Sequence, residues 1–103
     1  MNTRKAQKKK GWTEKQLAAR SDENLQRAVA EARKIIAHNV RSIRQKRGLT
    51  QAELASKAGI SVSYISNIER AKNAATLDKI VQIAKVLKVV PRVLLLENGY
   101  EDV

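Results

Sequence analysis

The chain of 103 residues contains no cysteine, which excludes disulfide bonds and thiolate metal sites and is compatible with a reducing cytoplasm. Aromatic residues make up only 3% of it, too few to supply the stacking platforms with which proteins hold single-stranded nucleic acid. No long apolar run, signal sequence or lipidation motif is present. We therefore expect a cytoplasmic protein with no membrane association.

Nothing in the sequence assembles into a catalytic or cofactor site. The single histidine, His38, has no matching set of metal ligands, so we expect it to be a surface residue. There is no phosphate-cradling glycine-rich loop and no pair of acids at a defined spacing. The sequence therefore predicts no enzymatic activity, no cofactor and no bound metal.

Positive charge is what the chain has in excess. It carries 21 lysines and arginines against 10 acidic residues, a formal net charge of +11. Such an excess favours a polyanionic partner. The length is sufficient for one small domain and too short for two ordinary ones.

The segment from Thr50 to Ile68 has the signals of two short helices joined by a turn. Thr50 and Glu53 form a capping box, in which each side chain bonds a backbone N–H at the start of a helix. Gly59 suits the end of that helix because a residue without a Cβ adopts the left-handed conformation at little cost. Ser61 is placed to cap the second helix. This pattern indicates a helix-turn-helix, whose second helix fits the major groove of B-DNA.

Three stretches carry a resemblance to a known family. They are Arg44 to Ala55 (RQKRGLTQAELA), Gly59 to Ser61 (GIS) and Ile65 to Arg70 (ISNIER). Together they are similar to the lambda-repressor-like (Xre/Cro) helix-turn-helix family, over about residues 36–96. The resemblance implies an all-α, five-helix DNA-binding domain, double-stranded DNA as partner, association with the nucleoid, and a homodimer.

The resemblance also implies roles for individual positions. The residues expected to contact bases are Ser61, Val62, Ser63, Tyr64, Ser66 and Asn67. The residues expected to contact DNA phosphates are Arg41, Lys46, Arg47, Gln51, Lys72 and Asn73. Cations at the end of a helix are also explained by the helix dipole alone. In the family the positions of Arg44 and Glu69 pair with each other, so both are assigned to structure.

One position departs from the family pattern after the recognition helix. Ala71 stands where relatives usually have glycine. An alanine forced into the left-handed conformation costs about 1 kcal/mol. We therefore expect the helix to end differently here, which bears on the roles of Lys72 and Asn73.

The region before the domain divides into two parts. Residues 1–12 are basic and have almost nothing to bury, so they predict a disordered arm, which either follows the DNA backbone or is a solvated tail. Residues 13–34 predict a helical extension of the domain at 35–98. The apolar residues that form one helical stripe are Leu25, Val29, Ala32, Ile36, Val40 and Ile43. The extension either packs back on its own domain or pairs with another subunit.

The C-terminal part contains more apolar residues than one small core absorbs. Pro91 suits the first position of a last short helix and Asn98-Gly99 suits its end. The candidate dimer interface is Val90, Val93, Leu94 and Leu95, and core closure is the alternative for some of them. The C-terminal end from Glu97 to Val103, which includes the tail at 99–103, has three acids and no base and is not expected to lie on DNA.

The sequence therefore predicts a transcriptional regulator, most simply a repressor, that binds operator DNA as a dimer through a recognition helix at about 61–69. An alternative is an antitoxin-type regulator whose main role is to bind a protein partner, with autoregulatory DNA binding. A third possibility is nonspecific architectural binding driven by the arm and the net charge.

Overall fold

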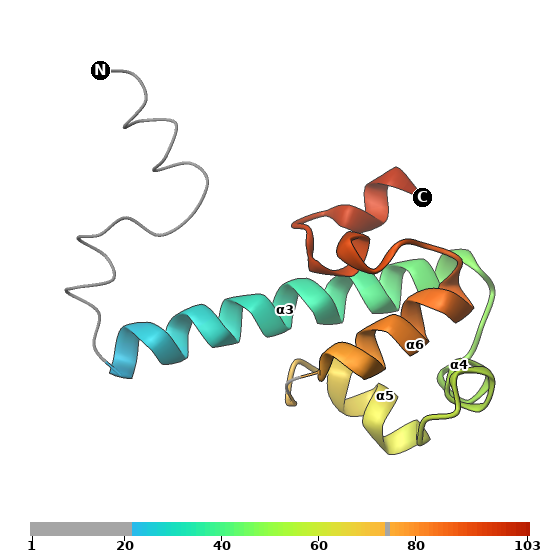
Figure 1. Cartoon of the computed structure of the whole chain (residues 1–103), viewed down its shortest axis with the longest axis horizontal. Helices are drawn as coiled ribbons and strands as arrows, with labels where there is room; N and C mark the ends of the chain where they lie inside the picture. The colour runs from blue at the N-terminus through green and yellow to red at the C-terminus, as the bar shows by residue number, and fades with distance from the viewer. Residues whose placement is uncertain (1–21, 74) are drawn as a thin grey trace.

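The computed structural model describes residues 22–73 and 75–103, and within them the chain is all α-helical and 3-10-helical (Figure 1). The α-helices are α3 (Asp22–Lys46), α4 (Gln51–Ala58), α5 (Val62–Glu69) and α6 (Leu77–Leu87). The 3-10 helices are η1 (Pro91–Leu95) and η2 (Gly99–Asp102). The all-α prediction is confirmed, but the last expected helix is a 3-10 helix. The basic arm at 1–12 and the first part of the predicted extension lie outside the described residues.

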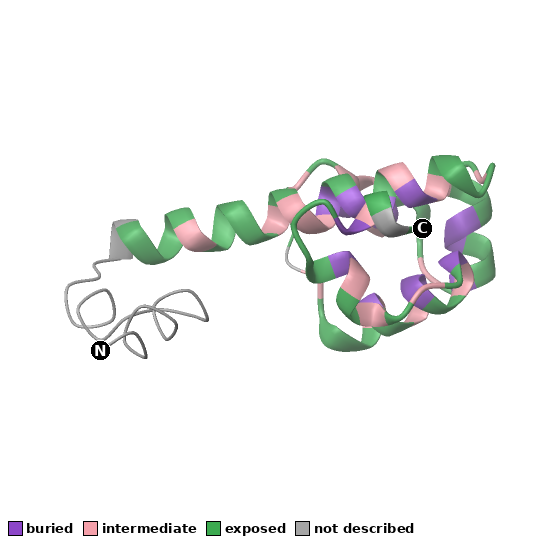
Figure 2. Cartoon of the chain, turned by 90° about the horizontal axis from the view of Figure 1, so that it is seen from above, coloured by how far each residue is buried: buried purple, intermediate pink, exposed green. Residues whose placement is uncertain are grey.

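The apolar stripe predicted from Leu25 to Ile43 lies on one uninterrupted helix, α3. Its C-terminal half packs into the domain and buries Val40 and Ile43 completely. Its N-terminal half projects from the domain (Figure 2). Leu25 and Val29 on this projecting half are exposed. The stripe is therefore a core face over only part of its length.

No helix in the described part of the chain is long and apolar enough to cross a membrane.

One hydrophobic core joins all of these elements, and η2 contributes to it through Tyr100, which packs against the buried cluster. The largest fully buried apolar side chains of this core are Val40, Ile43, Leu54, Ile65, Ile68, Ile83, Leu87 and Leu94. Leu94 is fully buried, so its prediction as a dimer-interface residue is wrong. The tight 3-10 turn of η1 directs this side chain into the core, while the neighbouring Leu95 stays exposed.

The capping signals predicted the starts of the helices correctly. Thr50 Oγ1 accepts a hydrogen bond from the Glu53 N–H at 3.0 Å, and Glu53 Oε1 accepts one from the Thr50 N–H at 2.8 Å. The hydrogen bonds from Thr50 hold the pKa of Glu53 below its ordinary value. Gly59 ends α4 with φ 70°, and Ser61 Oγ accepts from the Tyr64 N–H at 3.1 Å.

Ala71 adopts the left-handed conformation despite its Cβ, with φ 58°. Its N–H donates to the Ile68 carbonyl at 3.0 Å, and the Lys72 N–H donates to the Asn67 carbonyl at 2.9 Å. The expectation that the helix would end differently is therefore wrong. These two hydrogen bonds satisfy the end of α5 and offset the steric cost of the alanine.

Asn39 is the one fully buried polar side chain in the described part of the chain, and no sequence pattern singles it out. Its Nδ2 donates to the carbonyls of Leu96 at 2.8 Å, Leu94 at 3.0 Å and Val93 at 3.2 Å. Its Oδ1 accepts from the Tyr100 N–H at 3.1 Å. A single amide thus fixes both η1 and η2 on α3.

We predict that Asn39→Ala destabilises the fold by about 2–4 kcal/mol, because it leaves several buried carbonyls and an N–H without partners. Urea unfolding followed by circular dichroism measures this loss. The control Asn73→Ala removes the same amide from an exposed loop residue and is expected to change stability by less than about 0.5 kcal/mol. Equal effects of the two substitutions would contradict the anchoring role of Asn39.

Candidate nucleic-acid interface

The start of α5 presents short side chains to the surface. Ser61, Val62 and Ser63 are exposed, and Val62 remains 47% exposed although it is apolar. Ser66 and Asn67, one turn further along, are half-buried. The opposite face of α5 buries Ile65 and Ile68 in the core. Of the residues predicted to contact bases, only those at the start of the helix are therefore fully exposed.

Tyr64 differs from the other residues predicted to contact bases. It is half-buried and packs against the core. Its hydroxyl accepts a hydrogen bond from the Thr76 N–H at 3.2 Å, and Lys79 Nζ lies 6.0 Å from the ring centroid. These contacts tie Tyr64 to the start of α6, so we interpret it as a structural residue of the α5–α6 connection.

Arg44 and Glu69 form a two-pronged ion pair beneath the motif. Arg44 Nε lies 2.6 Å from Glu69 Oε2, and Nη2 donates to Glu69 Oε1 at 2.9 Å. The two side chains are only 11% and 3% exposed. The hydrogen bond to Glu69 raises the pKa of Arg44, which burial opposes. The pair therefore links α3 to the end of α5.

Two further hydrogen bonds extend this link to the start of α4. Arg44 Nη1 donates to the Leu49 carbonyl at 2.8 Å, and Gln51 Nε2 donates to Glu69 Oε1 at 3.0 Å. Gln51 is the first residue of α4 and is half-buried. The Gln51 amide nitrogen thus donates a hydrogen bond to the carboxylate of the ion pair. The position of Gln51 at a helix N-terminus also suits the binding of an anion.

The six residues predicted to contact phosphates fall into two groups. Lys72 and Asn73 are exposed in the connection that follows α5, and Gln51 is held to the end of α5 through Glu69. The other three lie on or just after α3. Arg41 is exposed there.

Lys46 and Arg47 both donate hydrogen bonds to backbone carbonyls of the domain. Lys46 Nζ donates to the carbonyls of Tyr100 at 2.6 Å and Val103 at 3.0 Å. Arg47 Nε donates to the Leu87 carbonyl at the end of α6, at 2.8 Å. The C-terminal turns and α5 lie on opposite sides of α3 (Figure 1). We therefore interpret Lys46 as a structural residue and leave it out of the phosphate-contacting set, while the phosphate contact of Arg47 stays a prediction.

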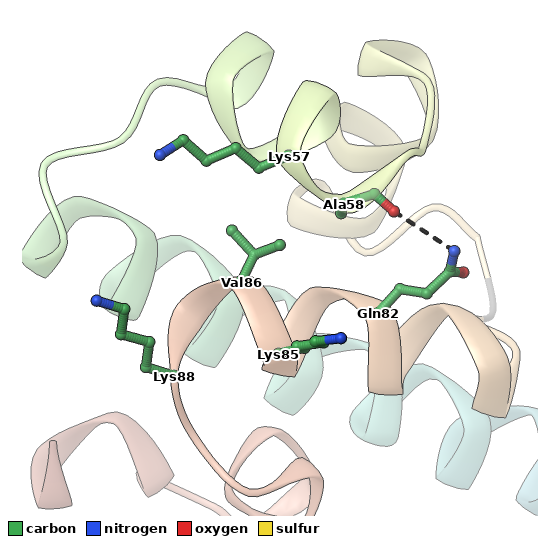
Figure 3. Close-up of a pocket in the computed structure, with 6 residues that line it drawn as sticks. All are labelled: Lys57, Ala58, Gln82, Lys85, Val86 and Lys88. Atoms are coloured by element: carbon green, nitrogen blue, oxygen red, sulfur yellow. Dashed lines mark hydrogen bonds between the residues drawn. The ribbon is translucent and has the colours of Figure 1, made fainter.

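A shallow pocket between α4 and α6 adds positive charge that the sequence did not locate. Its lining residues are Lys57, Ala58, Gln82, Lys85, Val86 and Lys88 (Figure 3). Gln82 Nε2 donates to the Ala58 carbonyl at 3.4 Å. The ammonium groups of Lys57 and Lys85 point in different directions, so the lysines raise the local positive potential without converging on one small anion.

Comparison with known proteins identifies the fold and the motif. A helix-turn-helix family model (HTH_3) matches residues 40–95. The control protein C.SmaI of Serratia marcescens is 37% identical over 72 residues, which are 70% of this chain and 86% of that protein. The uncharacterized HTH-type transcriptional regulator y4dJ of Sinorhizobium fredii is 32% identical over 59 residues, 57% of this chain and 77% of that protein.

Two solved structures have the same architecture. The hypothetical transcription factor NHTF from Neisseria has a TM-score of 0.64 and 33% identity, over 68% of this chain and 80% of that one. The restriction-modification controller protein C.AhdI from Aeromonas hydrophila has a TM-score of 0.59 and 30% identity, over 62% of this chain and 96% of that one. The predicted resemblance is confirmed, and the chain belongs to the HTH_3 (Xre-type) helix-turn-helix family of DNA-binding transcriptional regulators.

Proposed function

We propose that this regulator recognises a specific operator as a homodimer, with the first turn of α5 in the major groove, and that it represses transcription by occupying that site. The observation that carries the proposal is the exposed row Ser61, Val62 and Ser63 at the start of α5. These side chains are short, so they allow the helix backbone to approach the base edges closely. The core on the opposite face of α5 gives the helix a fixed orientation.

The side chains of α5 suit direct readout of bases. Serine hydroxyls both donate and accept hydrogen bonds, and Val62 offers a methyl surface to a thymine methyl group. Asn67 carries an amide that makes a two-point contact with adenine. Lys72 and Asn73, in the connection after α5, and Gln51, at the start of α4, would hold the flanking phosphates.

The proposed dimer forms through the C-terminal apolar surface. Val90, Leu95 and Leu96 are each about half exposed there, at 50%, 51% and 48%. Val93 is half-buried, and Leu94 belongs to the core. A two-fold dimer through this surface would place two copies of α5 on half-sites one helical turn of DNA apart. We define the exposed residues Val90, Leu95 and Leu96 as the C-terminal patch.

A second candidate function concerns the regulated genes. Two of the similar proteins are described as control proteins, one of them a restriction-modification controller. We therefore propose that this chain also controls a restriction–modification operon that includes its own gene.

The operator, selected from a random pool of DNA, is then expected upstream of the chain's own gene and of a neighbouring endonuclease gene. Footprinting on those upstream regions checks this. An operator found only at unrelated promoters would leave sequence-specific regulation intact and remove the controller role.

We predict that Asn67→Ala relaxes specificity at one base pair of each half-site, by about 1–3 kcal/mol, and leaves the other positions unchanged. The measurement is binding of the selected operator and its single-base variants by fluorescence anisotropy at fixed salt. A uniform loss across all operator variants would show that Asn67 reads no base.

Two substitutions complete this comparison. Lys72→Ala is expected to weaken binding evenly across sequences. The slope of the logarithm of the binding constant against the logarithm of the salt concentration is expected to fall in magnitude by about 1, the value for one phosphate contact. Ser56→Ala changes an exposed residue of α4 and is expected to leave both affinity and specificity unchanged.

We predict that Leu95→Glu raises the dimer dissociation constant by about 30-fold or more, because it places an unpaired carboxylate in an apolar interface. Sedimentation equilibrium measures the constant. Leu77→Glu makes the same change at a leucine that is 71% exposed on α6, and it is expected to leave association unchanged. Equal behaviour of the two variants would remove the C-terminal patch from the interface.

A further inference from the structure

The part of α3 from Leu25 to about Ala32 projects beyond the domain (Figures 1 and 2), and the next residue of the stripe, Ile36, packs against the domain's own core. Leu25 and Val29 are 46% and 39% exposed on it. An isolated helix of about 15 residues is only marginally stable in water. We therefore expect a second surface to cover the exposed apolar stripe and to stabilise this part of the helix.

The spacing of the stripe favours another helix as its cover. Leu25, Val29, Ala32 and Ile36 are separated by 4, 3 and 4 residues, the spacing of the seam between two supercoiled helices. Ala32 is small and permits a close approach of the two backbones. The cover is therefore expected to be another helix with a matching stripe.

The stripe matches itself when a second copy runs antiparallel. Leu25 then lies opposite Ile36 of the second copy, and Val29 lies opposite Ala32 of the second copy. In the middle of the pair, Val29 of each copy faces the small Ala32 of the other copy. Every contact occurs twice, once on each side of a two-fold axis. A parallel pair would instead place Ala32 against Ala32 and leave a void, which close packing disfavours.

The stripe is also continuous with the C-terminal patch. Residues seven apart on an α-helix lie about 20° apart around its axis, so Ala32 and Asn39 occupy nearly the same side of α3. Asn39 donates to the carbonyls of Leu94 and Leu96, which sets the C-terminal turns on that side. The C-terminal patch alone has three large exposed side chains, whereas a stable interface uses roughly 20–30 residues from each partner. The stripe on α3 supplies much of the missing surface.

An unsatisfied polar atom lies beside the stripe. Arg33 Nε is buried and has no hydrogen-bond partner in the described part of the chain. Gln26 and Arg33 flank the stripe on the same side because they too are seven residues apart. In the antiparallel arrangement Gln26 of the second copy comes close to Arg33, and its side-chain carbonyl can accept that hydrogen bond.

We propose that the N-terminal halves of α3 from two copies pair antiparallel along Leu25, Val29, Ala32 and Ile36. The pairing extends the C-terminal patch into a single two-fold interface. This inference rests on the proposed homodimer, and it gives the projecting half of α3 a role in assembly.

The test compares one substitution on two sides of α3 in the full-length chain. Ala32→Glu places a carboxylate in the seam, and Ala30→Glu places it on an exposed position well away from the seam. Sedimentation equilibrium is expected to show a dimer dissociation constant raised at least 10-fold by Ala32→Glu and changed less than two-fold by Ala30→Glu. Circular dichroism of both variants checks that the helix is retained.

The direction of pairing is tested with single cysteines, which is possible because the chain has none of its own. An equimolar mixture of Val29→Cys and Ala32→Cys chains is expected to form the mixed disulfide in preference to either self-linked dimer. Preferential self-linking of Val29→Cys would indicate parallel pairing and overturn the proposed arrangement.

The remaining outcomes separate this inference from the proposed function. A monomeric unaltered chain at all concentrations overturns the homodimer and the α3 pairing together. Loss of the dimer with Leu95→Glu but not with Ala32→Glu overturns the pairing and leaves the homodimer. Reduced thermal stability of Ala32→Glu with unchanged association means that the chain's own residues cover the stripe, which also overturns the pairing.

Discussion

The ion pair between Arg44 and Glu69 is the contact on which the position of the recognition helix depends. Its hydrogen bonds reach from α3 to Leu49, to Gln51 at the start of α4, and to the end of α5. Glu69 is almost completely buried, so loss of Arg44 would leave an uncompensated charge, typically a cost of about 3–5 kcal/mol. The pair therefore acts mainly by orienting the helices. The helix-turn-helix is held in one geometry because the buried carboxylate of Glu69 is compensated only where Arg44 lies beside it.

Asn39 performs the corresponding task on another side of the same helix. It lies five residues before Arg44, which places the two side chains about 140° apart around the axis of α3. Arg44 holds the helix-turn-helix, and Asn39 holds the turns that carry the C-terminal patch. One rigid helix thus sets the position of the proposed base-reading surface relative to the proposed dimer surface. A fixed relation of this kind is what two half-sites at a defined spacing require.

Local signals predicted most of the fold, because helix starts and ends are decided by neighbouring residues. Thr50, Gly59 and Ser61 behave as their capping chemistry requires. The prediction failed where a residue's environment depends on distant parts of the chain. Leu94 and Leu95 are identical leucines, and only the turn of η1 against the core decides which one is buried. For the same reason Asn39 and the internal contacts of Lys46 could not be found from spacing alone.

The distribution of charge separates affinity from specificity. The chain has a net charge of +11, yet α5 contains no lysine or arginine, and its one acid, Glu69, is neutralised by Arg44. The proposed reading surface is therefore nearly neutral, and the electrostatic attraction to DNA must come from residues outside it, such as Lys72. Phosphate attraction is independent of sequence, whereas hydrogen bonds and methyl contacts in the groove are not. A neutral reading helix on a basic domain thus favours discrimination between sites over the uniform binding of an architectural protein.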